Sequence, residues 1–70
     1  MESIVRNSLG GTLERLRVEN GWTQQELADR IYCSRATIGH IETGRREPSL
    51  STLRRLADIF GTDINILVNS

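Results

Sequence analysis

The sequence of 70 residues has little of several residue types that build functional sites. It contains one cysteine, one histidine, one proline, three aromatic residues and no lysine. A single cysteine, Cys33, excludes an internal disulfide and a zinc site built on paired cysteines, and His40 has no second histidine as a metal partner. We therefore expect neither a metal nor a cofactor.

Long apolar runs are also absent. No stretch approaches the ~20 apolar residues that span a bilayer, and the opening MESIVRNS lacks the apolar core of a secretory signal. We expect a cytoplasmic protein without a membrane partner. No Ser/His/acid set, Cys/His set or phosphate-binding glycine loop stands out, so we do not expect an enzyme.

The formal net charge is zero, and the overall charge gives no sign of nucleic-acid binding. The charges are unevenly placed, however, because residues 30–46 contain four arginines and one acidic residue. All the basic residues are arginine, whose planar guanidinium pairs well with phosphate and with guanine edges.

Apolar residues recur at helical spacing, and no segment alternates with the period of two that indicates a half-buried strand. The pattern predicts an all-α fold with helices at 8–19, 24–31, 35–43, 50–60 and 64–68. We expect one domain over 1–70, with its core in 9–61 and a C-terminal helix in 62–70.

The clearest helix start is in WTQQEL. Thr23 is placed to cap the helix and Glu26 to reach back to it, while Trp22 is placed to pack on Leu27 as a hydrophobic staple. Ser34 is the expected cap of the next helix. The two helices at 24–31 and 35–43 are too short to be stable alone and are joined by three residues. This arrangement is typical of a helix-turn-helix, whose second helix enters the major groove of DNA.

A helical wheel of 35–43 puts Ile38 and Ile41 on the inner face. The outer face is small and polar, and it carries Ala36, Gly39, His40 and Thr43, with Arg35 at the N-terminal end. Gly39 costs about 1 kcal/mol relative to alanine inside a helix, so close approach of another surface is one reason for it.

These outward residues have chemistry that suits DNA. Arg35 can donate two hydrogen bonds to guanine, His40 can donate or accept at a base edge, and the Ala36 methyl can contact thymine. Phosphate contacts are expected from the start of the second helix and from the loop after the third; these are Gln24, Gln25, Arg45 and Arg46.

From Leu13 to Gly61 the chain resembles the Cro/C1-type helix-turn-helix domain of phage repressors and bacterial Xre-like regulators. The resemblance rests on an ordered set of residues: Gln24, Glu26, Leu27, Ala28, Ser34, Ile38, Ile41, Glu42, Gly44, Pro48, Leu53, Ala57 and Gly61. Two positions depart from the family pattern. Tyr32 stands where the family commonly has glycine, and Ala36 stands where many relatives have a base-reading glutamine.

The resemblance implies a five-helix domain of the lambda-repressor type that binds operator DNA as a symmetric dimer. It implies an ion pair between Arg17 and Glu42. Carried over by position, it assigns base contacts to Arg35, Ala36 and His40, with Thr37 and Gly39 at the margin, and phosphate contacts to Gln24, Thr43, Arg45 and Arg46.

We therefore expect a sequence-specific transcriptional regulator of double-stranded DNA, a repressor rather than an activator, that binds a palindromic operator as a homodimer. The apolar C-terminal segment is the expected dimer contact: Ile59, Ile64, Ile66, Leu67 and Val68. Only nine residues follow Gly61, so we expect no small-molecule effector domain. The alternative is a small protein-interaction or antitoxin-type module that binds mainly a protein partner.

Overall fold

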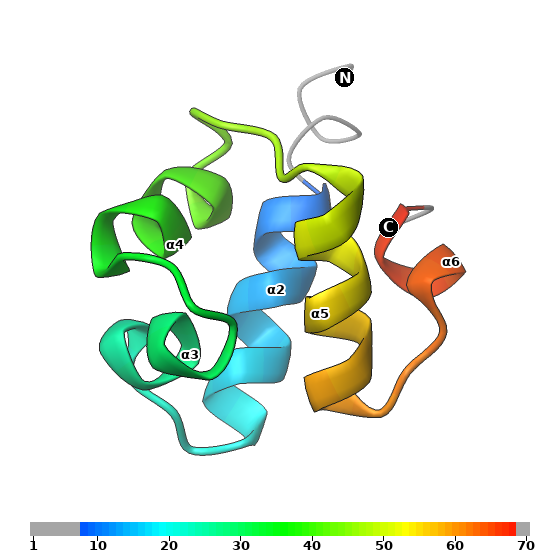
Figure 1. Cartoon of the computed structure of the whole chain (residues 1–70), viewed down its shortest axis with the longest axis horizontal. Coiled ribbons are helices and arrows are strands. Elements are labelled where there is room, and N and C mark those ends of the chain that lie inside the picture. The colour runs from blue at the N-terminus through cyan, green and yellow to red at the C-terminus, as the bar shows by residue number, and fades with distance from the viewer. Residues whose placement is uncertain (1–7, 69–70) are drawn as a thin grey trace.

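The computed structural model describes the backbone of residues 8–68, and this part of the chain is entirely helical (Figure 1). The helices are α2 (Ser8–Glu19), α3 (Gln24–Arg30), α4 (Arg35–Glu42), α5 (Leu50–Phe60) and α6 (Ile64–Val68). The all-α prediction is confirmed. The second and third predicted helices each end one residue earlier than expected, because Ile31 and Thr43 are C-cap residues.

Side-chain caps fix the helix starts. The Thr23 hydroxyl accepts a hydrogen bond from the Glu26 amide at 3.0 Å, and the Glu26 carboxylate accepts one from the Thr23 amide at 2.8 Å. This is the predicted capping box. Ser34 and Ser49 cap α4 and α5 through their hydroxyls, which accept hydrogen bonds from the Thr37 and Thr52 amides. Each cap satisfies an amide that lacks a partner within its helix, so short polar residues define where these helices begin.

The turn between α3 and α4 is closed by Tyr32, which adopts a left-handed conformation with φ of 63°. The following Cys33 amide donates to the Ala28 carbonyl at 3.0 Å. A non-glycine residue in this conformation costs about 1–2 kcal/mol. Tyr32, which stands where the resembled family commonly has glycine, thus adopts the backbone conformation that glycine would take.

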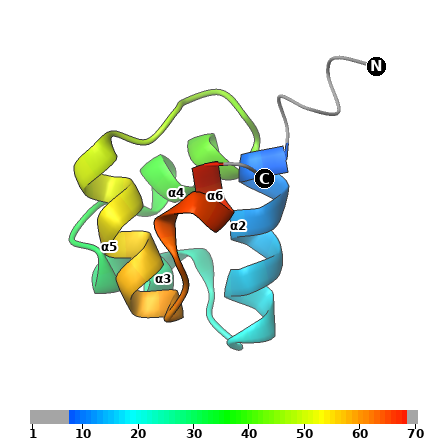
Figure 2. The same ribbon diagram turned by 90° about the vertical axis from the view of Figure 1, so that its right-hand side faces the viewer.

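The core draws on every helix between residues 8 and 68. Its buried apolar residues are Leu13, Leu27, Ala28, Ile31, Ile38, Ile41, Leu56, Ala57 and Leu67. Figure 2 shows α6 lying between α2 and α5, where it covers one side of this core. None of the described helices has the length and apolar character needed to cross a bilayer.

One of the expected dimer contacts is wrong. Leu67 is fully buried within its own chain, because α6 packs on α2 and α5 and uses this side chain to close the small core. Ile59 and Ile64 are half-buried and pack against the same core. Ile66 is 54% exposed. The side chain of Val68 lies outside the described residues.

Gly10 marks the closest approach of α2 to α4. A Cβ atom at this position would lie 2.5 Å from the Glu42 carbonyl oxygen and 2.7 Å from that of Ile41. These are backbone atoms, so they cannot move aside as a flexible side chain would. A hydrogen in place of a side chain at Gly10 therefore lets the start of α2 contact the end of α4.

We expect Gly10→Ala to lower the free energy of unfolding by about 1–3 kcal/mol, because the two helices must separate. Gly11→Ala is the matched control, since a Cβ there meets nothing within 4 Å. This control is expected to raise stability by about 0.5–1 kcal/mol through helix propensity. Urea unfolding followed by circular dichroism measures both, and equal effects of the two substitutions would contradict the account.

Candidate nucleic-acid interface

The outer face of α4 is open to solvent. Arg35, Ala36, His40 and Thr43 are exposed, whereas Ile38 and Ile41 on the opposite side are buried. The wheel analysis therefore placed the two faces correctly. Thr37 is half-buried and its hydroxyl lies 2.9 Å from that of Ser34, so it is engaged at the helix cap.

Gly39 lies in the middle of this face, and its packing against residues 8–68 does not require a glycine. The nearest atoms to a Cβ built there belong to the Gln24 side chain, at 3.9 and 4.0 Å, which is ordinary van der Waals contact. The contrast with Gly10 is direct, because Gly10 faces backbone at 2.5 Å. Because glycine has no side chain, nothing projects from the middle of the exposed face of α4 at position 39.

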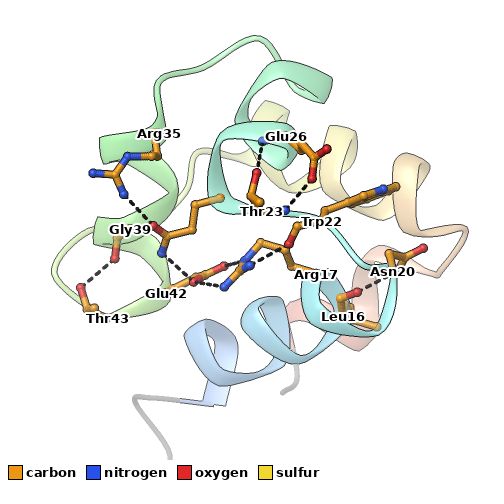
Figure 3. Close-up of polar contacts among 11 residues, drawn as sticks. Leu16, Arg17, Asn20, Trp22, Thr23, Glu26, Arg35, Gly39, Glu42 and Thr43 are labelled. Carbon is orange, nitrogen blue, oxygen red and sulfur yellow. Dashed lines mark hydrogen bonds and ion pairs between the residues drawn. The ribbon is translucent and has the colours of Figure 1, made fainter.

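Arg17 and Glu42 form the expected ion pair, which joins α2 to α4 (Figure 3). The Arg17 Nε atom donates to Glu42 Oε2 at 2.6 Å and its Nη2 atom to Oε1 at 3.2 Å. A third donor, Nη1, reaches the Trp22 carbonyl at 2.8 Å. The side chains are only 12% and 3% exposed. The hydrogen bond to Glu42 raises the pKa of Arg17 above its ordinary value.

Gln24 connects this ion pair to Arg35 on the outer face of α4. Its Nε2 atom donates to Glu42 Oε1 at 3.0 Å, and its Oε1 atom accepts from Arg35 Nη1 at 3.0 Å (Figure 3). Because a carboxylate only accepts, Glu42 requires the amide nitrogen of Gln24 and turns the amide oxygen toward Arg35. Arg35 is thus held by a continuous chain of hydrogen bonds that begins at Arg17.

Sequence analysis assigned Gln24 to phosphate and did not anticipate its bond to Arg35. The two residues are eleven positions apart and on different helices, so no periodicity connects them. The structure leaves one amide hydrogen of Gln24 without a bond to the described residues, and that hydrogen is available to an anion.

Two other residues expected at phosphates are engaged within their own helices. The Gln25 amide donates to the Asp29 carboxylate at 2.8 Å. The Thr43 hydroxyl donates to the Gly39 carbonyl at 2.9 Å, so its proton points into α4. The Thr43 hydroxyl has no second proton to donate to an anion, whereas the Gln25 amide keeps one N–H that the Asp29 bond does not use.

Arg45 and Arg46 follow the end of α4. Their backbone amides both donate to the His40 carbonyl, at 2.8 and 3.2 Å, which folds the loop back over the helix end. Their side chains are exposed, and neither makes an ion pair within residues 8–68. With Arg35 they place three exposed arginines on and next to α4, against one exposed carboxylate of the same loop, Glu47.

No metal site is evident in the described part of the chain, where no three His, Cys, Asp or Glu side chains come together. Cys33 is partly buried, and burial raises the pKa of its thiol, which keeps it in the unreactive protonated form. The geometry therefore presents a binding surface made of α4, Gln24 and the loop that follows α4.

A family model described as a helix-turn-helix domain matches residues 8–65. The chain belongs to this helix-turn-helix family. The residues that match run from the first described helix into α6, so the match includes the whole surface described above.

Two curated relatives show the same membership. The chain is 36% identical over 59 residues to the SPbeta prophage-derived uncharacterized HTH-type transcriptional regulator YonR of Bacillus subtilis (strain 168), covering 84% of this chain and 55% of YonR. It is 34% identical over 61 residues to the immunity repressor protein of Bacillus phage phi105, covering 87% of this chain and 42% of that repressor. The chain thus spans about half of the length of these relatives.

Among solved structures, the restriction-modification controller protein C.AhdI from Aeromonas hydrophila superposes with a TM-score of 0.81 at 29% identity. The superposition covers 89% of this chain and 90% of C.AhdI. The Cro/C1-type fold and the resemblance to phage repressors and Xre-like regulators are confirmed. The relatives named above are a transcriptional regulator and a repressor, and the matched structure is a controller protein.

We expect Arg17→Met to lower the free energy of unfolding by about 2–3 kcal/mol, because it leaves the buried Glu42 carboxylate without its cation. Arg15→Met is the matched control. Arg15 pairs with Glu19 on the same helix at 3.2 Å, but both side chains are more than half exposed, so its loss should cost less than about 0.5 kcal/mol. Urea unfolding of both variants measures the difference, and similar losses would show that the Arg17 pair contributes no more than a surface pair.

Proposed function

We propose that this regulator reads a specific, palindromic operator as a homodimer and represses transcription from it. The observation that carries the proposal is the position of Arg35. The Gln24 side chain holds it by a hydrogen bond at the start of the exposed face of α4, where most of the other side chains are small. A donor fork held at the start of a helix suits a guanine edge in the major groove, and its immobilisation reduces the entropy lost on binding. The relative from phage phi105 is named an immunity repressor, which supports repression, although another relative is named a transcriptional activator.

In this proposal Arg35 reads guanine, His40 reads a base edge one turn further along, and the Ala36 methyl contacts thymine. Thr37 and Gly39 lie at the margin of the readout. Because Ala36 has only a methyl group and Gly39 has no side chain, α4 can approach the base pairs closely. Specificity then comes from few side chains and from the shape of the groove.

Phosphate contacts are assigned to the exposed Arg45 and Arg46 and to the remaining amide hydrogen of Gln24. Thr43 would first have to release the Gly39 carbonyl, and Gln25 has one remaining N–H beside the carboxylate of Asp29. The contribution of Arg45 and Arg46 is therefore expected to be larger than that of Gln25 and Thr43.

Arg35→Ala and Arg46→Ala separate base reading from phosphate binding. We expect Arg35→Ala to weaken operator binding by about 1–3 kcal/mol and to relax the preference for one base. We expect Arg46→Ala to weaken binding to all sequences similarly and to reduce the slope of log affinity against log salt by about one. Fluorescence anisotropy on matched and mutated duplexes over a salt series measures both effects, and the reverse pattern would refute the contact assignment.

The dimer is proposed to form through the side of the molecule that carries α6. Ile66 and Leu50 are 54% and 58% exposed, and a shallow hollow between α5 and α6 is lined in part by Leu50 and Ile64. Ile59 lies half-buried on α5, and Val68 extends the same segment. One recognition helix reads only a few base pairs, so two half-sites one helical turn apart would give the required specificity.

We expect Ile66→Asp to weaken self-association by about tenfold or more, because it places a charge in an apolar contact. The monomer should remain folded, since Ile66 is more than half exposed. Val18→Asp is the control, because Val18 is equally exposed at 59% but lies on α2. Sedimentation equilibrium measures both. A wild-type chain that stays monomeric at micromolar concentration and binds a half-site as tightly as a palindrome would overturn the dimer.

The competing function is a protein-interaction or antitoxin-type module, and salt dependence distinguishes the two. A protein that binds several phosphates loses affinity linearly on a log–log salt plot. Absence of any binding to random duplex at ~50 mM salt would favour the protein-interaction module over the DNA-binding one.

A further inference from the structure

Two arginines outside the DNA-binding face each lie against an aromatic ring. The Arg30 guanidinium is 4.2 Å from the centroid of the Trp22 ring, and Trp22 stacks on Phe60 with centroids 5.5 Å apart. The Arg55 guanidinium is 5.8 Å from the Tyr32 ring. We call Trp22, Arg30, Tyr32, Arg55 and Phe60 the arginine–aromatic patch.

Both guanidiniums of the patch are held in place but lack a carboxylate partner. Arg55 also donates to the Ile31 carbonyl at 3.2 Å. Within residues 8–68 the ion pairs are Arg15–Glu19 and Arg17–Glu42, and neither involves the patch. A guanidinium that lies against a ring keeps its in-plane N–H groups open, and its restricted motion reduces the entropy lost on pairing. The patch therefore presents two guanidiniums that form no ion pair within residues 8–68.

Tyr32 adds a second, independent observation. Its φ of 63° is a conformation in which glycine is unstrained, and its side chain is 84% exposed. The ring therefore gains little burial to offset the backbone strain. Strain of this kind is characteristic of functional positions, and an exposed tyrosine with an arginine against its ring has the composition of a protein-binding hot spot.

The position of the patch favours a protein partner over DNA. Figure 3 shows Trp22 on the side of the molecule away from Arg35 and Thr43, so this part of the patch does not lie on the face that carries them. Single-stranded nucleic acid would need open ring faces for its bases, but the Trp22 ring is already occupied by Arg30 and Phe60. Carboxylates, in contrast, need only the free N–H edges of Arg30 and Arg55.

We propose that the arginine–aromatic patch is a docking surface for an acidic segment of a partner protein. The carboxylates of that segment pair with Arg30 and Arg55, and its remaining side chains pack on Tyr32. The proposal does not depend on the operator, because it uses none of the residues assigned to DNA.

The test uses the full chain labelled with nitrogen-15 and an octaglutamate peptide as the probe, with octaglutamine as the uncharged control. We expect a saturable shift of the Trp22 indole N–H and the Tyr32 amide with octaglutamate alone. Arg30→Gln with Arg55→Gln should weaken this binding by about tenfold or more. The matched double variant, Arg15→Gln with Arg54→Gln, removes the same charge outside the patch and should retain it.

Tyr32→Gly distinguishes a role of Tyr32 in binding the acidic peptide from a role in folding. Because glycine relieves the positive φ, we expect the midpoint of thermal unfolding to stay the same or rise, while affinity for octaglutamate falls and DNA binding is unchanged. The proposal is overturned if octaglutamate causes no saturable shift at the patch, or if both double variants lose it equally. It is also overturned if random duplex shifts the patch signals more strongly, or if they shift with protein concentration alone.

Discussion

The structure depends on the contact between Arg17 and Glu42, because it joins the first described helix to the end of the recognition helix. The Glu42 carboxylate accepts three hydrogen bonds, two from Arg17 and one from Gln24. It thereby sets the orientation of the Gln24 amide, which in turn holds Arg35. The position of Arg35, the proposed base reader, therefore depends on three helices and not on α4 alone.

The Arg17–Glu42 ion pair also contributes stability to a domain whose apolar core is small. Helices α3 and α4 are too short to be stable alone, and each begins at a side-chain cap and buries two apolar residues. The absence of a side chain at Gly10 lets α2 reach the end of α4, and Leu67 of α6 closes the other side. Apolar packing and the hydrogen bonds between Arg17, Glu42 and Gln24 thus hold α4 at the surface with its small residues facing outward.

Much of the fold was predictable because its signals are local. Thr23, Ser34 and the isoleucines of α4 fix starts and faces through neighbours within one turn. The bond between Gln24 and Arg35 was not predictable, because it depends on how two helices cross. Leu67 was misassigned for a similar reason: α6 is apolar on more than one side, and only its packing shows which side is buried.

The central claim is that the chain from Arg17 to Gln24 positions Arg35 to read DNA. Selection of binding sites from a random duplex library, with the wild type and with Gln24→Ala, tests it most directly. The account predicts that the wild type enriches two-fold symmetric sites with a guanine in each half, and that Gln24→Ala keeps the half-site spacing but loses the preference for guanine. Failure of the wild type to enrich any site, or equal enrichment of guanine by Gln24→Ala, would contradict it.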